Sequence, residues 1–176
     1  MKQNWKFLLL VLPLLLSACS STIVNHSRCG TVNFDSRTAV VPFSNNTETP
    51  LAGERAMSIA AAVLESKGIH NLVVYKNNHQ GRVLFPGMNK VESEKALMHW
   101  AREHHARYLL TGNVNEWTYK VGLDGEPVVG LSIQVIDLAS GKIVWTAVGS
   151  ENGGSRTALS TVAQELTNSL IKGMFC

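Results

Sequence analysis

The sequence lacks the short motifs that mark several common enzyme families. It contains no His-Glu-x-x-His, no Cys-x-x-Cys, no Gly-x-Ser-x-Gly and no phosphate-binding glycine loop that ends in Lys-Ser or Lys-Thr. Each of these chemistries depends on those residue types at those spacings. We therefore predict that the protein is not an enzyme and that it has no cofactor.

One cluster of polar side chains comes closest to a metal site. His99 and Glu103 are four residues apart and share one face of a predicted helix, and His104 and His105 follow them. The same pattern is typical of a solvated helix end, where a histidine near the C-terminus is favoured by the helix dipole. We prefer the solvated end and predict no metal site.

The chain also lacks a large excess of positive over negative charge. The chain has 16 Lys and Arg against 13 Asp and Glu, a formal net charge of +3, and Lys2 and Lys6 lie in the N-terminal segment discussed next. Without those two, 14 basic side chains face 13 acidic ones. Nucleic-acid-binding domains carry clustered Lys and Arg and a high isoelectric point, so no nucleic-acid partner is expected.

The N-terminus has the three regions of a secretory signal peptide. Lys2 and Lys6 precede the apolar run 7–16, which is too short for a stable membrane span and is interrupted by Pro13. A buried N-terminal helix is the alternative interpretation, and we consider it much weaker. We predict that residues 1–18 are a signal peptide.

The end of that segment adds a lipid anchor to the prediction. Leu16-Ser17-Ala18-Cys19 resembles the lipobox, at which the thiol is lipidated and the signal peptide is cut. Several acyl chains, such as palmitate, would make the attachment at Cys19 stable, whereas one chain would not. An aspartate directly after the lipidated cysteine would resemble a signal for retention in the inner membrane, and this chain has Ser20 at that position. We therefore expect a protein held by lipid at the periplasmic face of the outer membrane.

Three cysteines are present, and lipidation of Cys19 leaves Cys29 and Cys176. Both would lie in an oxidising compartment, where such a pair forms a disulfide. The alternative is two unpaired thiols near frayed chain ends. We predict the Cys29–Cys176 disulfide.

Hydrophobic periodicity predicts one α/β domain at residues 38–176, after an N-terminal tether at residues 19–37 that is rich in Ser, Thr and Asn. The order β-α-β-α-β-β-β-α favours one mixed β-sheet of about five strands with about three helices packed on it. The predicted strands are residues 38–43, 72–75, 108–117, 129–135 and 143–148, and the helical apolar stripes lie within residues 56–64, 97–101 and 159–170.

Three segments recur in this order in a broad group of periplasmic lipoprotein domains, and they are Thr38–Asn45, Arg107–Val114 and Asp137–Trp145. The chain resembles this group, which includes the curli export lipoprotein CsgG, the penicillin-binding-protein activator LpoB and the N-terminal domain of TolB. Within it, the stretch Trp117–Leu131 and the following residues 135–141 are most similar to the PelC family, the outer-membrane lipoproteins of Pel exopolysaccharide export in biofilms. The likeness covers residues 38–172 and implies a CsgG/TolB-N-like sandwich.

The resemblance implies a homo-oligomeric ring of about twelve subunits that funnels a cationic polysaccharide to the outer-membrane export protein PelB. Carboxylates repeated around such a ring would focus a negative field at its pore. By position, Asp124, Glu126 and Glu116 are the candidate funnel residues. Arg107 is the candidate for a salt bridge at the subunit interface.

The tryptophans allow two interpretations. Trp100 is expected in the core. Trp117 and Trp145 are strand residues that suit the core but could instead contact the membrane. A membrane-bound ring would benefit from an aromatic contact near the last helix, and residues 152–155 offer none. We therefore keep Trp117 and Trp145 as candidate membrane contacts.

Other functions stay open at this stage. An LpoB-like activator of a peptidoglycan synthase would normally have a long tether, whereas this one has fewer than twenty residues. A CsgG-like component of a secretion channel is a further alternative. A hydrolase that uses Asp124 and Glu126 is the last, although no nucleophile or base accompanies these two turn carboxylates.

Overall fold

The structure is a computed structural model that describes residues 21–27, 32–76, 90–122 and 125–175. Seven strands and three helices lie within these residues. In chain order they are β1 (Ser21–His26), β2 (Thr38–Val40), β3 (Ser44–Asn45), α2 (Ala52–Ser66), β4 (Leu72–Val74), α3 (Lys90–Glu103), β5 (Tyr108–Tyr119), β6 (Pro127–Asp137), β7 (Lys142–Asn152) and α4 (Leu159–Lys172).

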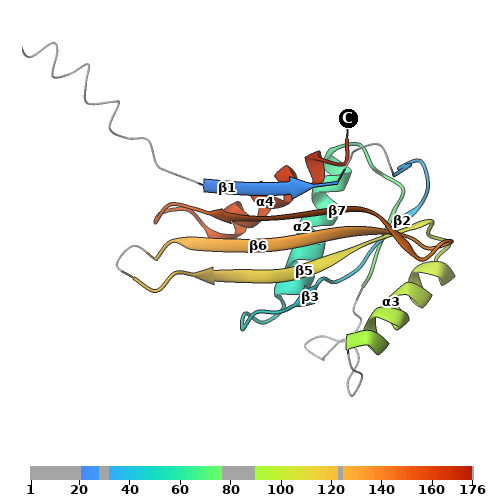
Figure 1. The fold of residues 1–176 in the computed structure, drawn as a ribbon, viewed down its shortest axis with the longest axis horizontal. Helices are drawn as coiled ribbons and strands as arrows, with labels where there is room; N and C mark the ends of the chain where they lie inside the picture. The colour runs from blue at the N-terminus through green and yellow to red at the C-terminus, as the bar shows by residue number, and fades with distance from the viewer. Residues whose placement is uncertain (1–20, 28–31, 77–89, 123–124, 176) are drawn as a thin grey trace, which may run out of the picture.

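The strands form one mixed sheet in the order β1-β7-β6-β5-β2-β4, and β3 also pairs with β5 (Figure 1). β5, β6 and β7 are long antiparallel neighbours, and β1 continues the antiparallel part beside β7. β2 pairs in parallel with β4 and β5, because the connections through α2 and α3 return the chain in the same direction. The predicted mixed α/β fold is confirmed.

Two strands were not predicted, β1 and β3, so the expected number of about five strands is too low. β1 lies inside the predicted tether at residues 19–37, and the expectation of an irregular segment is wrong for residues 21–26. Ile23 is 65% exposed and Val24 is half-buried, so the strand shows little apolar alternation. Its backbone pairs with β7 from Ser21–Asn152 to His26–Ala147. Pairing rather than burial therefore makes it a strand.

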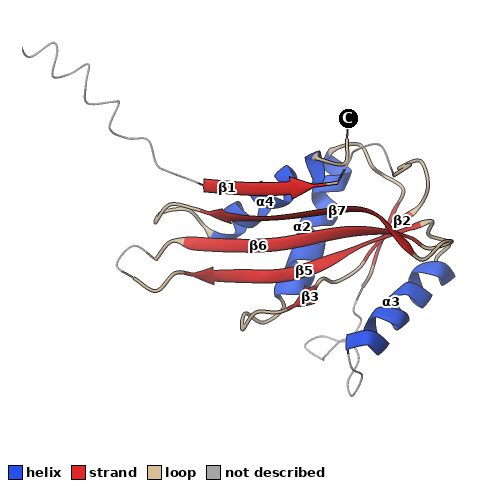
Figure 2. Cartoon of the chain, viewed as in Figure 1, coloured by secondary structure: helices blue, strands red, loops and turns tan. Residues whose placement is uncertain are grey.

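α2 and α4 lie side by side on one face of the sheet (Figure 2). In α2, Ala56, Ala60 and Leu64 recur at four-residue spacing and form a buried stripe. The helix ends before Gly68, which has a φ of +88° and suits the left-handed position after a helix. The first turn of α2 also lies close to the segment between β2 and β3, since a Cβ on Gly53 would clash with the carbonyl oxygen of Phe43.

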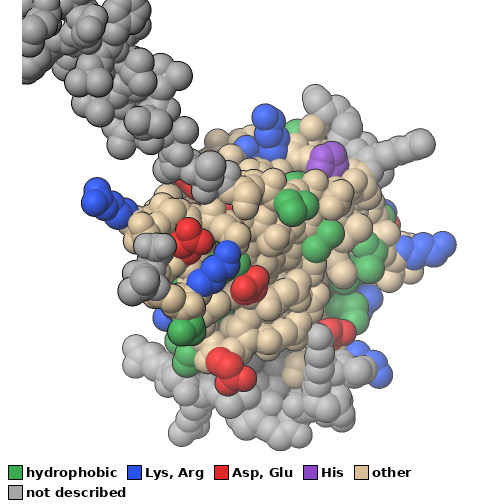
Figure 3. All heavy atoms as spheres, turned by 60° about the vertical axis from the view of Figure 1, so that its left-hand side comes forward, with side chains coloured by type: hydrophobic (Ala, Val, Ile, Leu, Met, Phe, Trp, Pro, Cys, Tyr) green, Lys and Arg blue, Asp and Glu red, His purple; other side chains and the backbone are tan. Residues whose placement is uncertain are grey.

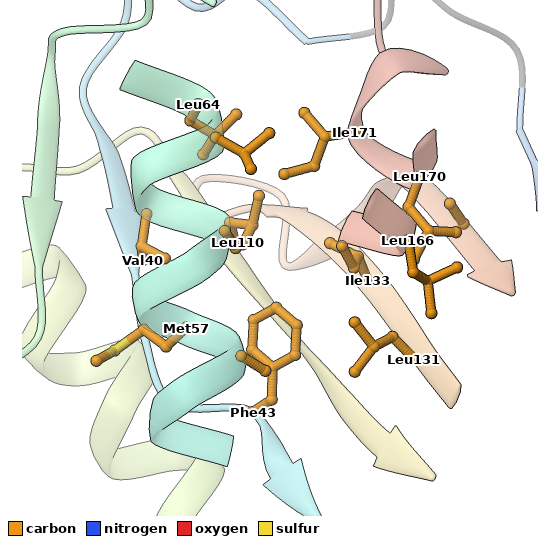
Figure 4. Close-up of a cluster of buried hydrophobic side chains, with 14 of the residues drawn as sticks. Val40, Phe43, Met57, Leu64, Leu110, Leu131, Ile133, Leu166, Leu170 and Ile171 are labelled. Atoms are coloured by element: carbon orange, nitrogen blue, oxygen red, sulfur yellow. The ribbon is translucent and has the colours of Figure 1, made fainter. Parts of the chain in front are cut away.

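The main core fills the space between these two helices and the sheet (Figure 4). Leu110 and Ile133 extend from β5 and β6 into the space that Leu64, Leu166 and Leu170 of the helices also fill. All five side chains are fully buried. Truncating one such side chain to alanine typically costs about 2–5 kcal/mol, so this layer carries much of the folding free energy.

α3 covers only one end of the opposite face. Its Leu97 and Ala101 pack with Leu109 and Leu138 in a second, smaller cluster. Trp100 is half-buried at the edge of this cluster, where its ring meets Tyr75 edge-on at 4.9 Å. The rest of that face has no helix over it among the described residues. Within the same residues, no helix combines the length and the apolar character that a membrane span requires.

Candidate functional site

The part of the sheet that α3 leaves uncovered includes three adjacent cross-strand rows near its middle. We call these rows the open face, and they are Thr111–Gln134–Thr146, Asn113–Ser132–Val148–Asn25 and Glu116–Gly130–Ser150–Ile23. Each position alternates along its strand with a core residue, so its side chain lies on the side away from α2 and α4. Glu116 is the one charged side chain in these rows.

A β-bulge determines the position of Glu116. The pairing of β5 with β6 passes from Val114–Leu131 directly to Glu116–Gly130, so Asn115 is an extra residue in β5. A Cβ on Gly130 would lie 3.2 Å from the Cβ of Glu116, so the glycine makes room for the Glu116 side chain. Glu116 is exposed and lines a shallow hollow of about 320 Å³ with Ile23 and Val148. It is therefore the candidate funnel residue best placed to meet a ligand.

The other two funnel candidates, Asp124 and Glu126, lie between β5 and β6 in the sequence. Asp124 lies outside the described residues. Glu126 is half-buried, and its carboxylate lies 3.8 Å from the Nζ of Lys120, so part of its charge is balanced within the hairpin. Glu126 is four residues from Gly130, the partner of Glu116, which corresponds to about 13 Å along a strand. Glu116 and Glu126 thus lie apart on the sheet, and the suggested carboxylate pair of Asp124 and Glu126 lies in part outside the described residues.

Arg107 lies at the opposite end of β5, where it pairs within its own chain. Its Nη2 donates a hydrogen bond to Asp137 Oδ2 at 2.9 Å, and its guanidinium lies 5.7 Å from the centre of the Tyr108 ring. A backbone hydrogen bond from Ala139 lowers the pKa of Asp137, and Arg107 lowers it further. The predicted interface arginine therefore already has an intramolecular partner, although its side chain is about half exposed.

Both candidate membrane tryptophans are buried. Trp117 is 3% exposed and Trp145 is 1% exposed, and both belong to the main core. They face α2 and α4 because they occupy the core-facing positions of β5 and β7. The prediction of a membrane contact by these two residues is wrong, and the core alternative is correct. Near Trp117, the exposed apolar side chains are those of Tyr119 and Val121.

The histidine cluster does not converge on a metal. His99 Nε2 lies 3.3 Å from Glu103 Oε1, and both side chains are mostly exposed. His104 turns back instead, and its Nδ1 is 2.9 Å from the carbonyl oxygen of Trp100. Among the described residues, no group of three or more His, Cys, Asp or Glu side chains is arranged to hold a metal ion.

The predicted lipidation and disulfide residues, Cys19, Cys29 and Cys176, lie outside the described residues, as does the predicted signal peptide. The segments next to the disulfide pair are described, and they meet. The rings of Phe34 and Phe175 stack with their centres 5.2 Å apart.

One ionisable residue was missed in the sequence. Glu151 is 5% exposed on the core-facing side of β7, and its Oε2 has no hydrogen-bond partner among the described residues. Burial raises the pKa of this carboxyl, and the nearby carboxylate of Glu165 raises it further, whereas a hydrogen bond with Thr22 lowers it. The alternation Trp145, Ala147, Gly149, Glu151 places it on the inner side and could have revealed it.

Comparison with solved structures first shows the class of protein. The fold matches lipoprotein GNA1162 from Neisseria meningitidis with a TM-score of 0.55 and 18% identity, over 78% of this chain and 96% of that one. The chain therefore has the α/β fold of a bacterial lipoprotein domain. No family model matches the sequence, and no curated protein matches it.

A higher identity defines the family. A PelC dodecamer from Paraburkholderia phytofirmans matches with a TM-score of 0.73 and 37% identity, over 88% of this chain and 97% of that one. A dodecamer of a single-substitution variant of that protein matches with a TM-score of 0.71 and 37% identity, over 88% and 99%. This chain belongs to the PelC family.

Proposed function

We propose that this protein is a non-enzymatic, lipid-anchored subunit of a ring on the periplasmic face of the outer membrane. There it guides a cationic polysaccharide to the outer-membrane export protein PelB. The observation that carries the proposal is the likeness to PelC dodecamers, which spans 97% of the PelC chain. Nearly all of a subunit that assembles into a ring thus has a counterpart in this chain.

The position of β1 supports attachment close to the membrane. Strand β1 begins at Ser21, two residues after the predicted lipidation site at Cys19. Two residues span at most about 7 Å, so a lipid on Cys19 would hold this end of the sheet near the bilayer surface. An LpoB-like activator would need a longer reach, and this short connection therefore favours a protein that stays at the membrane.

Glu116 is our first candidate for the acidic funnel. Its carboxylate is exposed, and it is the one charge on the open face. About twelve copies around a ring would add their fields and attract amine-bearing sugars, with an effect that weakens as salt rises. Glu126 is a weaker candidate because Lys120 balances it in part, and Asp124 is assigned by its place in the hairpin alone.

The funnel is tested by removing its charge without changing its shape. Glu116→Gln should reduce secreted polysaccharide several-fold and weaken binding of a glucosamine oligomer to the assembled ring at low salt. Glu103→Gln is the matched control, because Glu103 is an exposed glutamate on α3, away from the open face. Equal secretion and equal binding by the two variants would contradict the funnel role of Glu116.

The anchor has a separate test. Cys19→Ser should leave the fold intact, as judged by circular dichroism, and abolish export, because the ring would no longer be held at the membrane. Many anchors act together in a ring, so the loss should be close to complete. Normal export by Cys19→Ser would overturn the anchored ring.

A further inference from the structure

Strand β1 covers a small part of the core-facing side of the sheet. It lies at the edge beside β7, and α4 packs against both strands (Figure 1). Val24 of β1 is half-buried against the main core. A Cβ on Gly149, its partner in β7, would lie 3.2 Å from the side chain of Val24 and equally close to that of Leu166 in α4. Departure of β1 would therefore uncover the neighbouring core-facing residues of β7.

Glu151 is the ionisable residue next to β1 on this side. It pairs with Thr22 of β1 and with Val129 of β6. Its side chain is buried, and its Oε2 has no hydrogen-bond partner among the described residues. Thr22 and Glu165 of α4 each make a side-chain hydrogen bond with it. Glu165 is exposed, so Glu151 and Glu165 form a carboxyl pair that extends from the core to the surface.

Among the described residues, no basic group offsets the charge of this carboxyl pair. The other titratable side chains of β1, β6, β7, α4 and the turn before α4 are His26, Asp137, Lys142, Arg156, Glu165 and Lys172. Of these, Glu165 is the one whose charge acts on Glu151, and it is a like charge. On the other side of β1 and β7, the open face shows a broad area of uncharged side chains (Figure 3). A buried carboxylate beside a like charge favours its protonated form, so the pair holds a shared proton.

Strand β1 is held by few contacts. Its six residues pair with β7 alone within the described part of the chain, and five of the six are exposed. Ser27 adds hydrogen bonds with the backbone of Thr146 at the end of the strand. Edge segments with little buried surface open locally at a small cost in free energy. In the opened state, water would reach Glu151 and hydrate its carboxylate.

We propose that the carboxyl pair makes the docking of β1 depend on pH. β1 stays on β7 while Glu151 and Glu165 share a proton, and it is released when both carboxylates are charged. The direction agrees with the raised pKa of Glu151, since the docked state then binds the proton more tightly than the released state. Docking is therefore favoured at low pH and weakens as the pH rises through the raised pKa.

Release of β1 changes how far the domain can move from the membrane. This consequence rests on the proposed lipid anchor at Cys19, whereas the release itself requires only the fold. With β1 docked, the strand begins two residues after Cys19. The six residues of a released β1 would add at most about 20 Å of chain. Protonation thus selects between a domain held at the bilayer and one on a longer tether.

Hydrogen exchange followed by mass spectrometry tests the proposal on the full lipidated chain in detergent with a chelator. The protection factors of the β1 amides, corrected for the pH dependence of exchange itself, should fall several-fold between pH 5 and pH 8. Those of β6 should stay unchanged. Glu151→Gln should keep β1 protected at both pH values, because the amide cannot become charged. Glu165→Gln, at an exposed position that tolerates substitution, should show a smaller fall than the unmodified protein.

Glu103→Gln is the matched control, because Glu103 is an exposed glutamate of α3 on the opposite face of the sheet. It should show the full fall in β1 protection. A full fall in Glu151→Gln, or no fall in the unmodified protein, would overturn the proposal. Protection at pH 8 that returns when calcium replaces the chelator would mean that the pair binds a cation, which would also overturn it. None of these results depends on the ring or the anchor, so normal export by Cys19→Ser would remove the anchor and leave the carboxyl pair standing.

Discussion

The two faces of the same sheet differ in burial and in the residues they carry. On β5, Leu110 and Val114 face α2 and are fully buried, whereas Thr111 and Asn113 lie on the open face and are half-buried. Because side chains alternate along a strand, every second residue packs in the core and the others do not. The difference suggests that the covered face determines folding and that the open face contributes little to it.

The sharpest test of this difference compares neighbours on one strand. Leu110→Ala should lower the free energy of unfolding by about 2–5 kcal/mol, because it removes a fully buried side chain and leaves a cavity. Thr111→Ala, one residue on, should change it by less than about 0.5 kcal/mol. Urea unfolding followed by circular dichroism measures both, and similar losses at the two positions would show that the open face also supports the fold.

The first and last segments of the domain meet beside the covered face. Removal of a disulfide between them is the next largest expected effect on stability. Phe34 stacks on Phe175, and His26 lies against Gly173, so the segments flanking Cys29 contact the residues that precede Cys176. Cys29→Ser should lower the free energy of unfolding by about 2–4 kcal/mol in oxidised protein.

The control for that comparison is reduction. The unmodified protein and Cys29→Ser should be equally stable in a reducing agent, since only the unmodified protein has a bond to lose. Mass spectrometry that finds both thiols free in protein from the periplasm would disprove the disulfide.

The covered face was also the more predictable one. Alternation such as Leu131, Ile133, Val135 marks a strand with one buried side, and the four-residue spacing of Ala56, Ala60 and Leu64 marks a helix against it. Both patterns exist because burial selects apolar residues at fixed spacing. The mixed sheet with three helices follows from their order along the chain.

Features that depend on pairing or on local irregularity could not be predicted in this way. Strand β1 is held by backbone pairing with β7, which leaves no apolar pattern. The bulge at Asn115 changes the side of the sheet on which the following residues lie, so the exposure of Glu116 and the burial of Trp117 depend on one extra residue. The resemblance indicated Glu116, but only the structure places it on an uncharged face.

An ionisable group on the covered face gives a smaller effect that depends on pH. Burial raises the pKa of Glu151 above the ordinary value of 4.5. The contribution of this carboxyl to stability is therefore greatest when it is protonated, and it is lost as the pH rises through the raised pKa. Glu151→Gln should be more stable than the unmodified protein at pH 7, by a few tenths to about 1 kcal/mol, and no more stable at pH 4.

Thermal unfolding over that pH range measures the effect. Glu165→Gln is the control, because Glu165 is exposed and acts on Glu151 through its charge and a side-chain hydrogen bond. It should show the same trend with a smaller amplitude. A stability difference for Glu151→Gln that does not vary with pH would contradict the burial of an ionisable carboxyl.

The smallest effect on stability belongs to the ion pair of Arg107 and Asp137, which lies at the end of the sheet opposite Glu116. The Arg107 side chain is 49% exposed and the Asp137 side chain is 13% exposed. If Arg107 acts only within its chain, Arg107→Gln and Asp137→Asn should change the unfolding midpoint by similarly small amounts, and both variants should form rings. If Arg107 also binds a carboxylate of the next subunit, Arg107→Gln alone should lower the ring fraction in native mass spectrometry. Asp137→Asn would keep the ring, because it frees the guanidinium for that partner. Since Arg107 already has a partner within its own chain, we expect the first result.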